Sequence, residues 1–340
     1  MDTIDIHAHV LLPGTLNTCG PAGPELTVND DVQSFRAGDY SIRGVRFADS
    51  PMSVPERRFA LMQRMGITFQ VLSPYPMLFF YDQPNQHAIE FARKHNDEMA
   101  ALVRQYPAHL GGFATLPMQN PDAAAAELQR AVSELSLMGS YIGSDINGTP
   151  LSHPSFEPLW AMHTSLGVPT VIHPGPQKLS SDKAPWDLDL IIGFSMDETS
   201  AVAHLVLGGV LDRHPELIAV IPHGGGFAPY VRSRFESAIS RRPWGKGLLD
   251  RPFSDLWNQL YFDTLIHDAV TLDYLVRAHG AARLLLGTNF AAWDQDDQMI
   301  ERIAQLAVSP SEKEAILGGN ARRLFWTRAR PASGNAAPAR

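Results

Sequence analysis

The chain has 340 residues, of which 44% are apolar and 19% are charged, and its formal net charge is -8. These values are typical of a soluble globular protein. The negative charge and the absence of a lysine- or arginine-rich run argue against a nucleic-acid partner. No apolar stretch has the length that a membrane span needs. Cys19 is the only cysteine, so an intramolecular disulfide is excluded and a reducing, cytoplasmic compartment is expected.

Short segments rich in β-branched residues alternate with amphipathic segments along the chain. The predicted strands cover residues 3–7, 68–72, 110–115, 140–143, 169–173, 217–222, 259–262 and 283–286. The predicted helices include residues 56–65, 85–106, 122–135, 155–166, 198–213, 227–242 and 271–279. Asn120 before Pro121, and Thr199 with Ser200, are typical of helix starts. Eight such repeats predict an α/β fold, a (β/α)8 TIM barrel, as a single domain over residues 1–327.

Two segments interrupt this alternation. Residues 12–55 are too long for a simple connection between a strand and a helix, and they contain a weak strand pattern near residues 40–47. We expect them to form an insertion over the C-terminal mouth of the barrel. Residues 328–340 are rich in proline and alanine and predict a disordered tail.

Histidines stand at the ends of several predicted strands. His7 and His9 lie two residues apart at the end of the first strand, so their side chains share one face. His173 ends the fifth strand and His223 ends the sixth. The strand ends of a parallel barrel meet at one mouth. A group of imidazoles gathered there indicates a metal site.

The motifs in these positions resemble those of the amidohydrolase superfamily. The resemblance runs from residue 4 to residue 325, in the branch that contains 2-amino-3-carboxymuconate-6-semialdehyde decarboxylase and the γ-resorcylate-type decarboxylases. The motifs are DIHAH at 5–9, GFATLPMQ at 112–119, FEPLW at 156–160, VIHP at 171–174, GGV at 208–210, RHPEL at 213–217, HGGG at 223–226, FDT at 262–264, LGTN at 286–289 and GNARRLF at 319–325.

The resemblance implies a ligand set for one divalent metal. His7, His9 and His173 would bind the ion, which would be zinc or, as the second choice, manganese. His223 would act as the acid or base beside it. The family places an aspartate at the end of the eighth strand, as a ligand and proton carrier, whereas this chain has Asn289. No lysine ends the fourth strand, so a binuclear site is not expected.

Asn289 changes the chemistry of that position, because an amide is a neutral, weaker ligand and no base near neutral pH. One alternative is an adapted site in which His223 moves the proton. A second is that Asp294, five residues further on, takes the place of the missing carboxylate, although Ala291, Ala292 and Trp293 separate it from the strand end. A third is a weakened or inactive site.

The predicted substrate-binding residues lie in the loops around the mouth. Tyr75 and Phe79 follow the second strand and would form an apolar wall. Arg43 and Arg46 in the insertion would hold a carboxylate, from the same chain or from a dimer partner. Two further residues complete the predicted set, Trp186 and His267.

We therefore expect a metal-dependent lyase that removes CO₂ from an aromatic or muconate-type acid. A hydrolase or hydratase acting on a ring-fission product or a lactone is the alternative. A non-catalytic homologue is the third possibility. The expected partners are a small acidic or aromatic substrate and a second copy of the chain in a homodimer.

Overall fold

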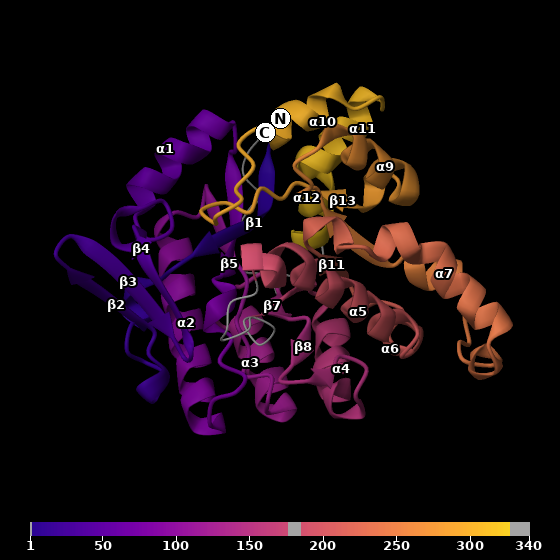
Figure 1. Ribbon diagram of the computed structural model, residues 1–340, viewed down its shortest axis with the longest axis horizontal. Coiled ribbons are helices and arrows are strands. Elements are labelled where there is room, and N and C mark those ends of the chain that lie inside the picture. Colours follow the sequence, from indigo (N-terminus) through magenta and orange to yellow (C-terminus); the bar gives the residue numbers. More distant parts are fainter. Residues whose placement is uncertain (1, 176–184, 327–340) are drawn as a thin grey trace.

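The computed structural model describes residues 2–175 and 185–326 (Figure 1). The predicted tail at 328–340 therefore lies outside the described residues. Within them, eight parallel strands alternate with helices, as predicted. They are β1 (Ile4–Val10), β5 (Phe69–Pro74), β6 (Leu110–Gly112), β7 (Ser140–Gly143), β10 (Thr170–His173), β11 (Ala219–Ile221), β12 (Leu260–Asp263) and β13 (Leu284–Leu285).

The strands follow one another around a barrel. Parallel pairing joins β1, β5 and β6 in one set, and β7, β10, β11, β12 and β13 in the other. A bridge between Ala114 and Ser140 joins the sets on one side, and a bridge between Ala8 and Phe290 joins them on the other. The ring of strands is thereby continuous, so the side chains at the C-terminal ends of the strands meet at one mouth.

Helices cover the outside of the strands (Figure 1). They are α1 (Pro55–Met65), α2 (Asn85–Gln105), α3 (Pro121–Ser133), α4 (Glu157–Leu166), α5 (Phe194–Val206), α6 (Val210–Arg213), α7 (Ala228–Arg241), α8 (Phe253–Trp257), α9 (Ala269–His279), α10 (Met299–Gln305), α11 (Pro310–Glu314) and α12 (Asn320–Phe325). None of the described helices has both the length and the apolar character to cross a membrane.

One of the two predicted helix starts is confirmed and the other is wrong. The Asn120 side chain accepts a hydrogen bond from the Ala123 amide at 3.2 Å and caps α3. Thr199 lies inside α5, where its hydroxyl donates to the Ser195 carbonyl at 2.7 Å, one turn back. The single helix predicted over 198–213 is also interrupted, because Gly209 has a φ of +73° between α5 and α6.

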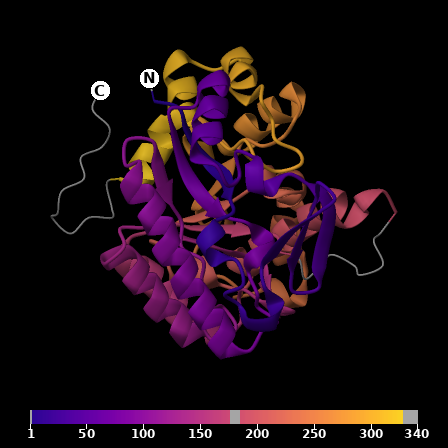
Figure 2. The same ribbon diagram turned by 90° about the vertical axis from the view of Figure 1, so that its left-hand side faces the viewer.

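The insertion after β1 forms its own small sheet. Strands β2 (Glu25–Asn29), β3 (Val32–Ala37) and β4 (Tyr40–Val45) pair antiparallel. The weak strand pattern seen in the sequence is thus β4. The sheet stands at one side of the barrel in both ribbon views (Figures 1 and 2), and in Figure 1 it lies beside α2. A cluster of buried apolar side chains that includes Phe35, Met77 and Phe80 attaches it there.

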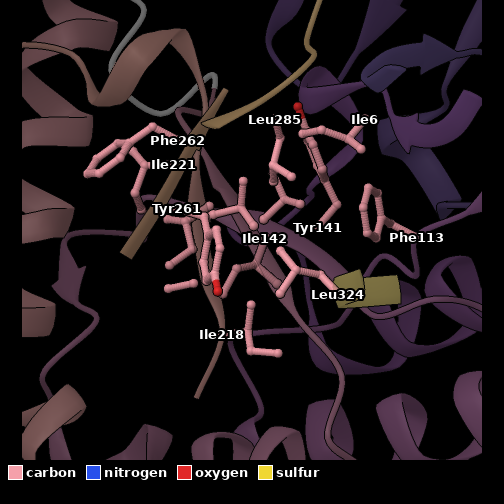
Figure 3. Close-up of a cluster of buried hydrophobic side chains, with 14 of the residues drawn as sticks. Ile6, Phe113, Tyr141, Ile142, Ile218, Ile221, Tyr261, Phe262, Leu285 and Leu324 are labelled. Carbon is pink, nitrogen blue, oxygen red and sulfur yellow. The ribbon is translucent and has the colours of Figure 1, made fainter. Parts of the chain in front are cut away.

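Apolar side chains from the strands fill the inside of the barrel. Figure 3 shows part of this core, in which Ile6 of β1, Tyr141 of β7 and Leu285 of β13 lie close together. A filled interior leaves only the mouth for a ligand, as in other barrels of this kind.

A buried polar network closes the seam between the first and last strands. The Asp5 carboxylate accepts hydrogen bonds from the Thr288 hydroxyl at 2.8 Å and from the Gln70 amide at 3.0 Å. Arg58 donates to Gln70 Oε1 at 2.7 Å and to the carbonyl of His9. Burial raises the pKa of Asp5 to about 6 and lowers the pKa of Arg58 to about 9. These bonds fix the backbone that carries His7 and His9.

Close strand packing requires a glycine before β7. Gly139 has a φ of +141°, and a Cβ there would run into the carbonyl oxygen of Pro169. We expect Gly139→Ala to destabilise the fold by at least about 3 kcal/mol, since steric overpacking adds to backbone strain. Gly148 has a φ of +81° with open space around it, so Gly148→Ala should cost only about 1–2 kcal/mol. Denaturant unfolding of both variants checks this. Equal losses would contradict the packing argument.

Candidate metal site at the barrel mouth

Three buried imidazoles meet at the C-terminal mouth. Their ligand nitrogens, from His7, His9 and His173, all lie within 4.8 Å of one another. His7 and His9 come from β1, where the strand alternation turns both side chains to the same face. His173 is the last residue of β10. The His7 Nε2 and His9 Nε2 atoms are 3.3 Å apart.

Hydrogen bonds at the far side of two rings decide which nitrogens face the centre. His7 Nδ1 bonds to the Asp263 carboxylate at 2.7 Å, and His173 Nδ1 bonds to the Pro174 carbonyl at 2.7 Å. Because both acceptors require an N–H, the Nε2 atom of each ring carries the lone pair. Asp263 is itself held by the amides of Gly224 and Leu265.

The electrostatics of the group suit a cation. Burial, followed by the neighbouring imidazoles, holds the pKa of both His9 and His173 well below the ordinary value, so these rings are neutral at pH 7. Tetrahedral zinc with Zn–N distances of about 2.0–2.1 Å places its nitrogens roughly 3.3 Å apart. The separation between His7 and His9 matches that spacing. The three donors therefore fit one divalent ion.

A cavity of about 590 Å³ opens above the imidazoles. Its lining includes His9, His173, His223 and Asn289, and the remaining lining is mainly apolar and aromatic. That lining includes Tyr40, Tyr75, Met77, Leu190, Ile191, Phe194, Leu265, Ile266, Ala292 and Trp293. No lysine or arginine is among the described residues that line it. The cavity thus offers an apolar slot with imidazole and carboxylate groups.

His223 is paired with a buried carboxylate. Its Nδ1 lies 2.5 Å from Glu198 Oε1 of α5. Burial alone would lower the pKa of His223, but the charge and hydrogen bond of Glu198 raise it to about 9. Burial raises the pKa of Glu198 to about 7. His223 therefore holds a proton beside the cavity, and its Nε2 is free of the Glu198 contact.

Asn289 and Asp294 also meet at the cavity. The Asn289 side-chain N–H donates a close hydrogen bond to Asp294 Oδ1. The second oxygen of Asp294 lies 3.4 Å from His267 Nε2. The separation in sequence that made Asp294 the weaker alternative is bridged by a tight turn, in which the Ala292 amide bonds to the Asn289 carbonyl. Asp294 therefore belongs to the site.

Two of the predicted substrate-binding residues line the cavity. Tyr75 stands edge-on to His9, with ring centroids 6.0 Å apart. His267 lies on the wall beside Asp294. The structure thus brings Tyr75 and His267 together with the histidines and Asn289.

The other four predicted substrate-binding residues do not line the cavity. Phe79 is 2% exposed and stacks on Tyr81 in the core, because the turn after Tyr75 carries it inward. Trp186 is 82% exposed and is not on the cavity wall. The exposed Arg43 and Arg46 are not on the wall either. In β4 the alternation turns Ile42 onto the apolar cluster and Arg43 to the opposite face.

Several site residues were absent from the predicted set. Asp263 directly follows a predicted strand, and that position was the available signal for it. Glu198 lies on a helix, and Tyr40 lies in the insertion, so neither follows a strand end. Trp293 comes from the turn after Asn289. Their positions depend on packing between distant segments, which no local pattern encodes.

Two known proteins with similar sequences are decarboxylases. The chain is 31% identical over 329 residues to 2-amino-3-carboxymuconate-6-semialdehyde decarboxylase of Dictyostelium discoideum, covering 94% of this chain and 90% of the relative. It is 30% identical over 311 residues to gamma-resorcylate decarboxylase of a Rhizobium species, covering 87% and 93%.

A solved structure agrees with the fold along nearly the whole chain. The crystal structure of 2,6-dihydroxybenzoate decarboxylase from Rhizobium superposes with a TM-score of 0.77 at 26% identity, covering 96% of this chain and 98% of the other. The amidohydrolase family model matches residues 4–326. The barrel, the histidines at its mouth and this match establish that the chain belongs to the amidohydrolase family.

Proposed function

We propose that this protein is a metal-dependent carboxy-lyase that releases CO₂ from a hydroxylated aromatic acid without oxidation. The observation that carries the proposal is the meeting of three buried imidazoles and a proton-holding His223 at one apolar cavity. The similarity to decarboxylases of aromatic and muconate-type acids supports it.

His7, His9 and His173 would hold one divalent ion. Three imidazoles suit zinc, which is our first choice, and manganese is the second. When bound, such an ion supplies positive charge that anchors substrate oxygens and offsets negative charge developing in the reaction. Asp263 would keep the His7 ring in the required tautomer.

His223 would supply the proton. When the bond between the ring carbon and the carboxylate breaks, its electron pair stays on the carbon, and a new C–H bond forms with the proton of His223. Glu198 holds the imidazole from behind at 2.5 Å and balances its charge. The cavity wall would keep the ring in place by apolar contact with Tyr75 and Phe194.

We further propose a homodimer. Helix α7 packs against both α5 and α9, and all three helices expose large apolar side chains. They include Met196, Tyr230 and Val270, the last two 80% and 79% exposed. Adjacent exposed apolar groups are typical of an interface.

The dimer is tested by light scattering after size exclusion, which should give twice the chain mass of 37.4 kDa. The Tyr230→Lys variant should shift the measured mass toward that of the monomer. A monomeric wild type would refute the dimer.

The proposed reaction is tested by following CO₂ from 2,6-dihydroxybenzoate, with benzoate as the matched control that lacks hydroxyl groups. We expect CO₂ release from the first compound only. Protein freed of metal by a chelator should be inactive and should recover with zinc or manganese. Turnover of a lactone with incorporation of oxygen from water, and no CO₂ from any acid, would instead identify a hydrolase.

His223 is the residue whose removal should affect turnover most selectively. A general acid contributes about 10²–10⁴-fold to the rate, so we expect His223→Asn to lower kcat at least 100-fold while bound metal stays at the wild-type level. Glu198→Gln should have a smaller effect in the same direction, because it leaves the imidazole in place. Elemental analysis beside steady-state kinetics checks both variants. Loss of metal from His223→Asn, with an unchanged rate per bound ion, would make His223 a ligand instead.

A further inference from the structure

The position of Asn289 is fixed by the strand that carries the histidines. The Phe290 amide donates to the His7 carbonyl at 3.0 Å, and the His9 amide donates to the Phe290 carbonyl at 3.0 Å. Asn289 has a φ of +49°, a left-handed conformation in which asparagine and aspartate are the favoured side chains after glycine. The backbone therefore places residue 289 beside the imidazoles and accepts either side chain.

The contact with Asp294 sets the orientation of the Asn289 amide. A carboxylate only accepts hydrogen bonds, so the NH₂ group of Asn289 must face it. The Oδ1 atom then points the other way. It is buried and has no hydrogen-bond partner among the described residues, and Asn289 is only 4% exposed and lines the cavity. A buried acceptor without a partner costs free energy and is typical of a position that binds an ion or a water.

Asp294 is held where it is by the turn that follows β13. The Asp296 amide donates to the Thr288 carbonyl at 3.0 Å, and the Ala291 amide donates to Gln295 Oε1 at 2.7 Å. Asp294 lies on the wall of the same cavity. Its oxygens are not part of the group of donors within 4.8 Å that His7, His9 and His173 form in the described chain. Asp294 therefore reaches that group through its hydrogen bond to Asn289 and, at longer range, through its charge, which opposes the lowering of the His9 pKa.

We propose that Asn289 and Asp294 together replace a single carboxylate at the end of the eighth strand. Asn289 Oδ1 faces the metal position as a neutral donor, and Asp294 is the positioning residue that orients the amide and adds negative charge behind it. A carboxylate bonded to the NH₂ group polarises the amide and makes its oxygen a stronger donor. The proposal rests on the metal site of the proposed function and on no particular substrate.

The test is a double-mutant cycle read out as metal affinity. Metal-free wild type, Asp294→Asn, Asn289→Asp and the double variant are titrated with zinc and with manganese, against a competing chelator. We expect Asp294→Asn to weaken binding by about 10–100-fold, the usual effect of removing a partner of a ligand. The double variant, which moves the carboxylate from 294 to 289, should return to within about threefold of the wild type.

Two further measurements separate this role from a general loss of structure. Asp273→Asn removes a carboxylate from an ion pair with Arg277 on α9 and should leave metal affinity unchanged. Cobalt absorption spectra should differ between the wild type and Asp294→Asn, and the double variant should show a spectrum of its own, because the donor at 289 has changed.

Wild-type affinity in Asp294→Asn, or losses that simply add in the double variant, would overturn the proposal. Failure of the proposed function would look different. In that case no acid would release CO₂, whereas the cycle of metal affinities would still show rescue.

Discussion

The site depends on burying three imidazoles with their lone pairs turned toward one point. The His7 Nε2 and His9 Nε2 atoms lie 3.3 Å apart, and a buried ring could turn its other edge to the centre if nothing held it from behind. Asp263 and the Pro174 carbonyl provide that hold for His7 and His173. Other buried polar contacts around the mouth hold Asp263 and the backbone that carries these histidines in place.

The need to hold the strand that carries His7 and His9 also explains why two ionisable side chains are buried in the interior. Asp5 and Arg58 are both buried, and burial disfavours the charged form of each. They do not touch directly but are connected through Gln70. An apolar pair of similar size would pack there at less cost in desolvation. The polar groups remain useful because they bind the Thr288 hydroxyl and the His9 carbonyl, and so align β1 with the end of β13.

Sequence reasoning succeeded where the chemistry follows the strands. His7, His9 and His173 stand at strand ends, and a parallel barrel brings strand ends together without further information. It failed where the side-chain direction depends on one turn. The short turn after Tyr75 sends Phe79 into the core. The sequence made Asp294 the weaker alternative for a similar reason. Its separation from Asn289 along the chain does not reveal the tight turn that brings the two side chains together. Arg43 and Arg46 do not line this chain's cavity, and a role for either in the mouth of a dimer partner stays a prediction.

The seam between β1 and β13 has a consequence for how the chain is made. Asp5 and its partner Thr288 are separated by 283 residues, and a ribosome adding about 5–20 residues per second needs roughly 15–60 s to span them. For that time the first strand, with His7 and His9, has no closing neighbour. The edge of β1 at this seam is thus among the last parts of the barrel to acquire its native contacts, although its other edge can pair with β5 much earlier.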